Sequence, residues 1–222
     1  MLPGCRGPAV STENNRSIYN LDAAYSIARQ QLATIDIEQQ CRRSGAHYQV
    51  KDTQKAVTIR YLNRSYLINL PDIEVSLVDS DEPVPIRDKI LILHYFILAK
   101  GTPSTNKQIT FRDLAGGTVY YPTFTKRTLE PLTNHFGREP ALLLKASEKM
   151  GSRKADYGDV AIIIDAFERV PITLVLWQGD DEFPPQLNLL FDSTISDYLD
   201  TEDVTVLCEI LTWRLIGYLR EA

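Results

Sequence analysis

The residues Val160–Trp177 read Val-Ala-Ile-Ile-Ile-Asp-Ala-Phe-Glu-Arg-Val-Pro-Ile-Thr-Leu-Val-Leu-Trp. Two β-rich runs, Val160–Ala166 and Val170–Trp177, flank the short segment Phe167-Glu168-Arg169. Branched aliphatic residues are enriched in strands, and two such runs with a short connection predict a β-hairpin. The hairpin indicates that the fold is built on an antiparallel sheet.

Two more regions extend this sheet. Leu187–Phe191 predicts a third strand after the hairpin. Earlier in the chain, apolar and polar residues alternate over Val57–Tyr61, and a similar pattern follows over Tyr66–Leu70. With Asn63 in the connection, these two runs predict another hairpin.

The expected helices are grouped apart from the hairpins. The spacing of apolar residues and the capping residues predict helices over Leu21–Leu32, Asp36–Arg43, Ile86–Lys100, Thr125–Phe136, Pro140–Met150 and a final helix capped by Asp200 or Thr201. Ile109–Phe124 is expected to be loop-like with short extended pieces around Gly116-Gly117, and no internal repeat is visible. This segregation predicts an α+β fold with a mixed, largely antiparallel sheet built from hairpins and packed against several helices.

The length of 222 residues suits one domain with a sizeable core. Residues Met1–Ser17 mix Gly, Pro, Ser and Asn without periodicity, which predicts a disordered tail. Residues 18–222 are then expected to form a single α+β domain.

The composition is typical of a soluble globular protein, with 44% hydrophobic and 24% charged residues. The beginning of the chain lacks the pattern of a secretory signal. The longest apolar run, Ile90–Ala99, contains His94 and is about half as long as a bilayer requires. We therefore expect a cytoplasmic protein with no membrane partner.

Charge is distributed unevenly along the chain. Residues 1–154 carry 21 Lys and Arg against 15 Asp and Glu, whereas residues 155–222 carry 3 against 14. The acidic part could face a cationic partner, pack against the basic part, or form a solvated surface. The acidic excess argues against nucleic acid as a partner, because binding to phosphates requires positive charge.

The segment Trp177–Asp192 contains the densest group of carboxylates. Asp180, Asp181 and Glu182 follow Gly179 and precede a Pro-Pro bend, so they are expected on a rigid turn that faces outward. They could bind a basic partner, be simply solvated, or hold a divalent cation with Asp192 as a fourth ligand. Asp192 could instead cap the turn that follows its strand.

His94 and a group of aromatic residues could contact a flat ligand. A neutral His94 could ligate a metal or the iron or cobalt of a tetrapyrrole, although a hydrogen-bonded core histidine is the simpler interpretation. Tyr120, Tyr121 and Phe124 follow two glycines and could line a pocket for such a ligand or pack in the core.

Common catalytic and cofactor motifs are missing from the sequence. It contains no phosphate-binding glycine loop, no His-Glu-x-x-His and no Gly-x-Ser-x-Gly. The three cysteines, Cys5, Cys41 and Cys208, form no Cys-x-x-Cys pair, so disulfide, zinc and iron–sulfur sites lack support.

The C-terminal part of the chain resembles a known prokaryotic family. The segments that carry the resemblance are Gly158–Ala161, Val170–Leu174, Trp177–Asp192 with its Leu190-Phe191-Asp192 motif, and Leu199–Asp203. They are similar to the uncharacterised family called domain of unknown function 3786, over roughly residues 86–219. The resemblance implies kinship with proteins of anaerobic bacteria and archaea, some of them accessory to iron–sulfur or corrinoid proteins. It supplies no catalytic residues, and Cys5 and Cys41 lack the spacing of a cluster-binding region.

These observations favour a non-enzymatic binding or accessory protein. Its pocket is expected between residues 116–124, 86–100 and 179–182, and would hold a flat cofactor such as a tetrapyrrole or corrinoid. A basic partner protein that binds the acidic face is the other candidate ligand. Two further hypotheses are a divalent-cation-dependent enzyme that uses Asp180, Asp181, Glu182 and Asp192, and a purely structural interaction module.

Overall fold

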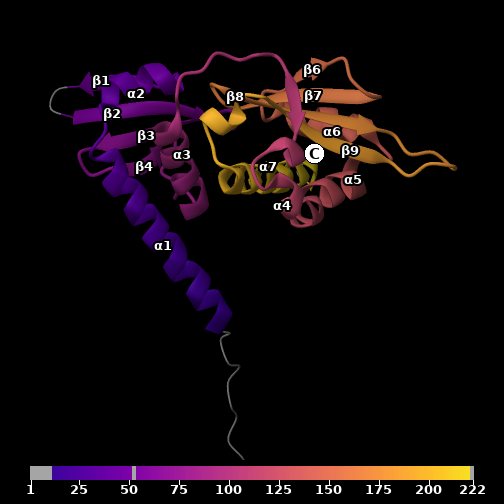
Figure 1. Ribbon diagram of the computed structural model, residues 1–222, viewed down its shortest axis with the longest axis horizontal. Coiled ribbons are helices and arrows are strands. Elements are labelled where there is room, and N and C mark those ends of the chain that lie inside the picture. Colours follow the sequence, from indigo (N-terminus) through magenta and orange to yellow (C-terminus); the bar gives the residue numbers. More distant parts are fainter. Residues whose placement is uncertain (1–11, 52–53, 221–222) are drawn as a thin grey trace, which may run out of the picture.

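A computed structural model describes residues 12–51 and 54–220 of the chain (Figure 1). The first helix, α1, spans Thr12–Leu32 and begins before the residues from which a helix was expected. Residues 12–17 are therefore helical, although the sequence predicts a tail there. The rest of that predicted tail, residues 1–11, lies outside the described residues.

The first group of strands follows a short helix. This helix, α2 (Ile37–Ser44), has Asp36 as its N-cap and ends at Gly45, which has a φ of 76°. Both features match the expected second helix. The strands that follow are β1 (His47–Lys51), β2 (Gln54–Tyr61), β3 (Arg64–Leu70) and β4 (Glu74–Leu77), after which comes helix α3 (Ile86–Leu98).

The second group of strands repeats this order. It consists of β6 (Arg153–Ala155), β7 (Val160–Phe167), β8 (Val170–Trp177) and β9 (Gln186–Asp192), and helix α7 (Thr201–Arg220) follows them. The predicted hairpins correspond to β2–β3 and β7–β8, and the predicted third strand is β9. Asp200 caps α7, because its side chain accepts a hydrogen bond from the backbone N–H of Asp203 at 2.8 Å.

All these strands, together with β5 (Gln108–Thr110), belong to one antiparallel sheet, whose central path is β4-β3-β2-β7-β8-β9-β5. Strand β1 pairs with β2 and β6 pairs with β7, so the two groups have the same pairing pattern on either side of the β2–β7 contact. That contact is narrow. It consists of the pair Tyr61 and Phe167 and a hydrogen bond from Leu62 N–H to the Ala166 carbonyl at 2.9 Å. The structure thus contains a repeat of topology that the sequence does not reveal.

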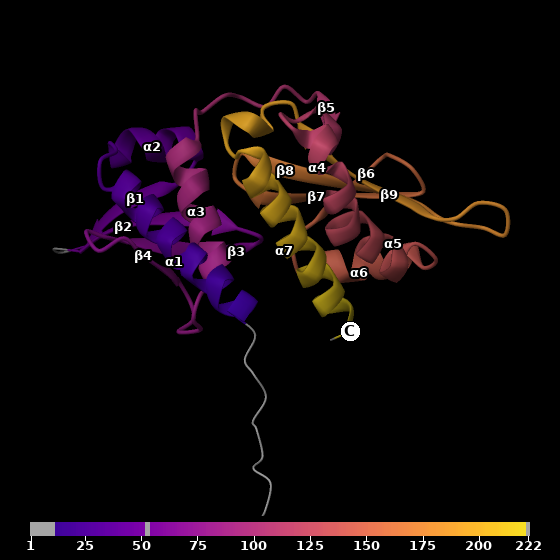
Figure 2. The ribbon, with the colours of Figure 1, turned by 60° about the horizontal axis from the view of Figure 1, so that its bottom comes forward.

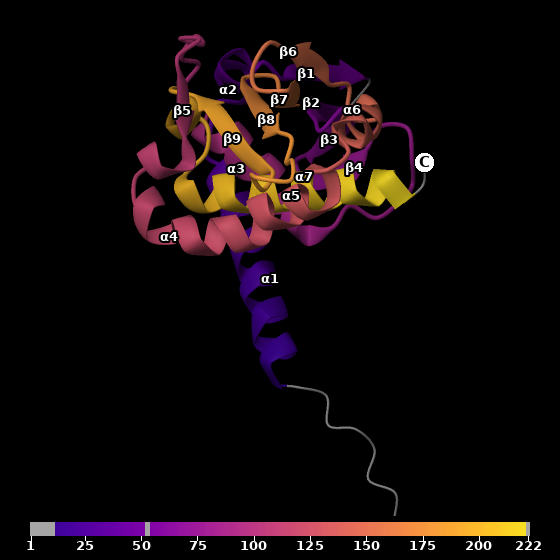
Figure 3. The same cartoon turned by 90° about the vertical axis from the view of Figure 1, so that its right-hand side faces the viewer.

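Helices cover one face of the sheet (Figures 2 and 3). Alternate residues of the central strands point to this face and are fully buried, among them Ile164, Ile172, Leu174, Leu189 and Phe191. Each such side chain stabilises the fold by roughly 1.5–3 kcal/mol relative to an exposed position. The other face of β7, β8 and β9 carries the intervening residues, including Asp165, Thr173 and Asp192.

The prediction of a loop over Ile109–Phe124 is wrong for most of that segment. It contains the end of strand β5 (Gln108–Thr110), a short 3-10 helix and helix α4 (Gly117–Phe124). Aromatic, β-branched and proline residues are poor helix formers, so local propensity gives no helix signal here. Tertiary packing decides the outcome, because the ring of Phe124 stacks on that of Phe111 with centroids 3.9 Å apart.

The helix predicted over Thr125–Phe136 is divided. Residues Thr125–Leu129 form a π-helical turn, and α5 (Glu130–Phe136) follows it. Pro131 lies at the beginning of α5, where its missing N–H removes a donor from the helical ladder. Helix α6 spans Pro140–Glu148. Over the described part of the chain, no helix has the length and apolar character needed to cross a bilayer.

Candidate functional site

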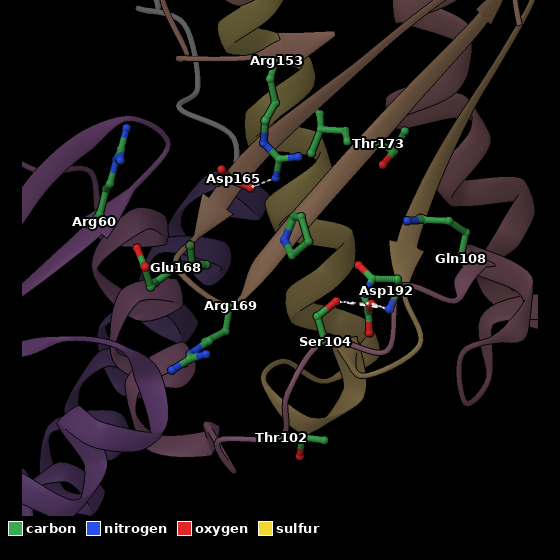
Figure 4. Close-up of a pocket in the computed structure, with 14 residues that line it drawn as sticks. Arg60, Thr102, Ser104, Gln108, Arg153, Asp165, Glu168, Arg169, Thr173 and Asp192 are labelled. Atoms are coloured by element: carbon green, nitrogen blue, oxygen red, sulfur yellow. Dashed lines mark hydrogen bonds and ion pairs between the residues drawn. The ribbon is translucent and has the colours of Figure 1, made fainter. Parts of the chain in front are cut away.

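A polar groove lies on the face of the sheet opposite the helices, where the two groups of strands meet. Its larger cavity, of about 430 Å³, is lined by residues that include Arg60, Ser104, Arg153, Asp165, Arg169 and Asp192 (Figure 4). A second cavity of about 270 Å³ shares Arg60 and Glu168 with the first. The two cavities therefore adjoin, and together they are called the outer groove below.

The register of the sheet builds the floor of the outer groove. Ile163 of β7 lies opposite Thr173 of β8, and Asp165 lies opposite Pro171. Because side chains alternate between the two faces of a strand, these four residues share one face. The narrow β2–β7 contact leaves the sheet open at this point, so the floor ends in a cleft beside Arg60.

The segment between α3 and β5 forms one wall, and Asp192 holds it in place. The Asp192 side chain is 3% exposed and its two oxygens accept six hydrogen bonds. The donors are the hydroxyls of Ser104, Thr105 and Thr194 and the backbone N–H groups of Thr105, Asn106 and Thr194. Burial alone would raise the pKa of Asp192, but the hydrogen bonds from Ser104 and Thr194 outweigh burial and lower the pKa.

The turn between β7 and β8 forms the opposite wall, and Tyr95 of α3 fixes it. The Tyr95 ring stacks on Phe167 with centroids 4.0 Å apart. The Tyr95 hydroxyl accepts a hydrogen bond from the backbone N–H of Arg169 at 3.3 Å and donates one to the carbonyl of Ser44. The turn is thus attached to both α3 and the end of α2.

Gly45 allows the side chains of this turn to lie against α2. A Cβ atom added to Gly45 would lie 2.6 Å from Cγ of Glu168 and 3.6 Å from Nε of Arg169. Gly45 also has a positive φ of 76°, which glycine adopts without strain. The positive φ and the close approach of Glu168 both favour glycine at position 45. The absence of a side chain there leaves room for the side chains of Glu168 and Arg169.

The charged groups of the outer groove differ in whether they have a hydrogen-bonding or ionic partner within the protein. Arg153 forms an ion pair with Asp165 at 2.8 Å, and Arg60 donates to the side chain of Asn63 at 2.7 Å. The guanidinium of Arg169 and the carboxylate of Glu168 form no ion pair or hydrogen bond with another described residue. Two adjacent and opposite charges are therefore available in the groove.

His94 lies away from the outer groove, in a separate cavity of about 370 Å³ between α1, α3 and α7. Its Nδ1 lies 2.9 Å from Oδ1 of Asp203, so the interpretation as a hydrogen-bonded histidine agrees with the structure. The hydrogen bond to Asp203 raises the pKa of His94. Burial raises the pKa of Asp203, and the hydrogen bond from His94 opposes that rise.

The structure does not bring the three aromatic candidates together into a pocket wall. Phe124 is buried and stacked on Phe111, which agrees with core packing. Tyr121 lies under the guanidinium of Arg112, 3.9 Å from ring centroid to Cζ, and Tyr120 is 58% exposed. None of the three lines the cavity beside His94.

The carboxylate turn projects at the tip of the β8–β9 hairpin, where Asp180, Asp181 and Glu182 are all exposed, as expected. One oxygen of Asp180 accepts hydrogen bonds from the backbone N–H groups of Glu182 and Phe183, at 2.9 and 2.7 Å. These bonds lower the pKa of Asp180.

Asp192 does not join these carboxylates. It ends the seven-residue strand β9 that begins just after the turn, which separates the two by roughly 20 Å. Within the described residues, no three His, Cys, Asp or Glu side chains are grouped to hold a metal ion. Asp192 accepts hydrogen bonds from the backbone N–H and hydroxyl of Thr194, but the N-cap of the following 3-10 helix, Ile195–Asp197, is Thr194.

Sequence reasoning missed Arg60, Arg153, Glu168 and Arg169. One local signal was present in the sequence. Asp165 interrupts one apolar strand and Thr173 interrupts the next, and a polar residue within an apolar strand marks a face of the sheet that contacts water. Nothing local indicates that Arg60 lies beside this face. Its place depends on the single pairing of Tyr61 with Phe167.

The fold and this site define an α+β protein with a helical layer on one side of an antiparallel sheet and a polar groove on the other. The chain matches the family described as "Domain of unknown function (DUF3786)" over residues 36–214 and belongs to that family. The match begins well before residue 86, where the resemblance was expected to start. No curated protein and no solved structure matches the chain significantly.

Proposed function

We propose that this protein is a non-enzymatic binding protein of the cytoplasm. Its ligand would be a small polar molecule with an anionic group, bound in the outer groove. The observation that carries the proposal is the guanidinium of Arg169, which lines the larger cavity without an ionic partner among the described residues. Arginine presents a planar set of donors that suits carboxylate and phosphate groups.

The size and lining of the groove support a small ligand. The larger cavity, about 430 Å³, falls within the range of roughly 300–1,000 Å³ typical of small-molecule sites. Hydroxyl and amide side chains that include Ser104, Asn106, Gln108 and Thr173 line it and could donate or accept hydrogen bonds. Such a lining suits a polar ligand better than a large apolar ring system.

The walls of the groove are held before any ligand binds. Asp192 fixes the segment around Ser104–Asn106, and Tyr95 fixes the turn that carries Arg169. A site whose walls are already ordered loses less conformational entropy on binding. This favours binding as the role of the groove. The proposal needs neither a flat cofactor beside His94 nor a cation at the carboxylate turn.

The test compares three proteins by native mass spectrometry and thermal unfolding. The wild type, Arg169→Ala and Arg138→Ala are purified anaerobically; Arg138 is an exposed arginine outside both cavities. Unfolding is followed with added inorganic phosphate or succinate at constant ionic strength. We expect a co-purified small molecule, or stabilisation by one of the two anions, that Arg169→Ala abolishes and Arg138→Ala retains. If Arg169→Ala behaves like both other proteins, the proposal is wrong.

A further inference from the structure

The β7–β8 turn places two opposite charges next to each other in the outer groove. Glu168 lines both cavities and Arg169 lines the larger one. In Figure 4 the Glu168 carboxylate lies on the side of Arg60, whereas the Arg169 guanidinium extends to the other side of the turn. Neither side chain has an ionic partner among the described residues.

Other charged groups of the groove are already compensated within the protein, whereas Arg60, which lines both cavities, donates only to the side chain of Asn63 and has no ionic partner among the described residues. Arg153 is paired with Asp165, and Asp192 is saturated by its six hydrogen bonds. A ligand with only a negative group would satisfy Arg169 and leave Glu168 as a nearby repulsive charge. A ligand with only a positive group would meet the reverse problem. A ligand that carries both charges avoids either penalty.

The turn that carries the two side chains is held at a defined position. Their stems pass close to Gly45, where the absence of a side chain gives them room. The backbone of Arg169 is hydrogen-bonded to Tyr95, which is itself buried. Both side chains are exposed, but the backbone of the turn that carries them is fixed by Tyr95.

We propose that the ligand of the outer groove is a small zwitterion of the amino-acid type. Arg169 binds its carboxylate and Glu168 binds its ammonium group. This inference rests on the proposed function and adds the chemical class of the ligand. The hydroxyl and amide groups on the wall formed by Ser104 and Asn106 then face the body of the ligand.

The experiment uses isothermal titration calorimetry on the full chain at constant ionic strength and neutral pH. The probes are the α-amino acids, 4-aminobutyrate and 5-aminovalerate. Each zwitterion is compared with two analogues of the same carbon skeleton, a carboxylate that lacks the ammonium group and an amine that lacks the carboxylate. We expect at least one zwitterion to bind at least tenfold more tightly than both of its singly charged analogues.

Two substitutions assign the charges. Glu168→Gln should weaken zwitterion binding toward that of the matching carboxylate and leave carboxylate binding unchanged. Arg169→Gln should abolish binding of both. The matched controls are Arg138→Gln and Glu139→Gln, because Arg138 and Glu139 are also adjacent, opposite and exposed but line neither cavity. Both controls should bind like the wild type.

The possible results separate the two proposals. If carboxylates bind as tightly as zwitterions and Glu168→Gln has no effect, the zwitterion inference is overturned while anion binding at Arg169 stands. If no probe binds in a manner that depends on Arg169, and native mass spectrometry finds no co-purified molecule, both proposals fail.

Discussion

The carboxylate of Asp192 accepts a hydrogen bond from the backbone N–H of Asn106 at 2.8 Å, and this bond joins the end of β9 to the wall of the outer groove. Asp192 is the last residue of the Leu190-Phe191-Asp192 motif. Leu190 and Phe191 occupy consecutive positions in the sheet, with Phe191 fully buried. The motif therefore combines one core residue with one residue that organises the groove.

Asp192→Asn should destabilise the protein substantially. An amide has only one oxygen, so several of the six donors around Asp192 would lose their acceptor in a buried place. We expect the free energy of unfolding to fall by about 2–4 kcal/mol, because buried donors left without acceptors are costly. Urea unfolding measures the change. The control Asp181→Asn alters an exposed carboxylate and should change stability by less than about 0.5 kcal/mol.

The contribution of Asp192 should also depend on pH. Its pKa in the folded protein is lowered, so its stabilisation is present above the unfolded pKa of about 3.9 and is lost as pH falls below it. The difference in unfolding free energy between the wild type and Asp192→Asn should therefore be constant from pH 7 to pH 5 and shrink below pH 4. A difference that grows on acidification would contradict the assignment.

Gly45→Ala should reduce both stability and ligand affinity. The new methyl group would meet the side chain of Glu168 at 2.6 Å, and alanine is strained at a φ of 76°. We expect a loss of about 1–2 kcal/mol in unfolding free energy. Chemical denaturation measures this loss. Gly116 has a similar φ of 73° but open space around its Cβ position, so Gly116→Ala separates backbone strain from the clash. If Gly45→Ala and Gly116→Ala reduce the affinity for the ligand of the outer groove equally, the loss in Gly45→Ala does not come from displacement of Glu168.

The carboxylate turn should not confer a response to Mg²⁺. Asp180 already accepts two backbone hydrogen bonds, Asp181 and Glu182 are exposed, and the described residues contain no group of three His, Cys, Asp or Glu side chains placed to hold a metal ion. Adjacent carboxylates that do not converge bind this ion weakly. We expect added MgCl₂ to shift the melting temperature equally in the wild type and in the Asp181→Ala, Glu182→Ala double variant. A larger shift in the wild type would restore the cation hypothesis.

The sequence predicts those helices and strands whose conformation is determined by the residues within the element itself. The hairpin at Val160–Trp177 and the helix at Ile86–Leu98 have apolar runs long enough to specify strand or helix. Short strands are different: Arg153–Ala155 is a strand because β7 lies beside it. Helix Gly117–Phe124 likewise depends on Phe111, a partner that local propensity cannot reveal.

The site was less predictable than the fold because it is assembled from distant segments. Its position depends on the contact between Tyr61 and Phe167, which brings Arg60 beside the β7–β8 turn. Carboxylates and aromatic residues that are dense in sequence drew attention to Asp180–Glu182 and to Tyr120. In the structure these residues are exposed at separate places, and single charged residues from several strands form the groove.

The pair of His94 and Asp203 should make stability depend on pH near neutrality. The hydrogen bond that His94 donates to Asp203 raises the pKa of His94 above its ordinary value of about 6.5, and Asp200 and Glu202 add to this effect. The protonated histidine therefore stabilises the fold fully below pH 6.5, and this stabilisation is lost as pH rises through the folded pKa. His94 and Asp203 link α3 to α7. The bond between the two helices should thus weaken in alkaline solution.

His94→Gln isolates this contribution, since glutamine can donate a hydrogen bond but carries no charge. We expect the wild type to be more stable than His94→Gln by about 1 kcal/mol at pH 6 and by less at pH 9, because a charge-assisted hydrogen bond is replaced by a neutral one. Urea unfolding at both pH values gives the two differences. In an Asp203→Asn background the same substitution should have equal effects at both pH values, since the charge that raises the pKa of His94 is removed. A difference that persists unchanged in that background would assign the pH dependence to another group, such as Asp200 or Glu202, both of which line the same cavity.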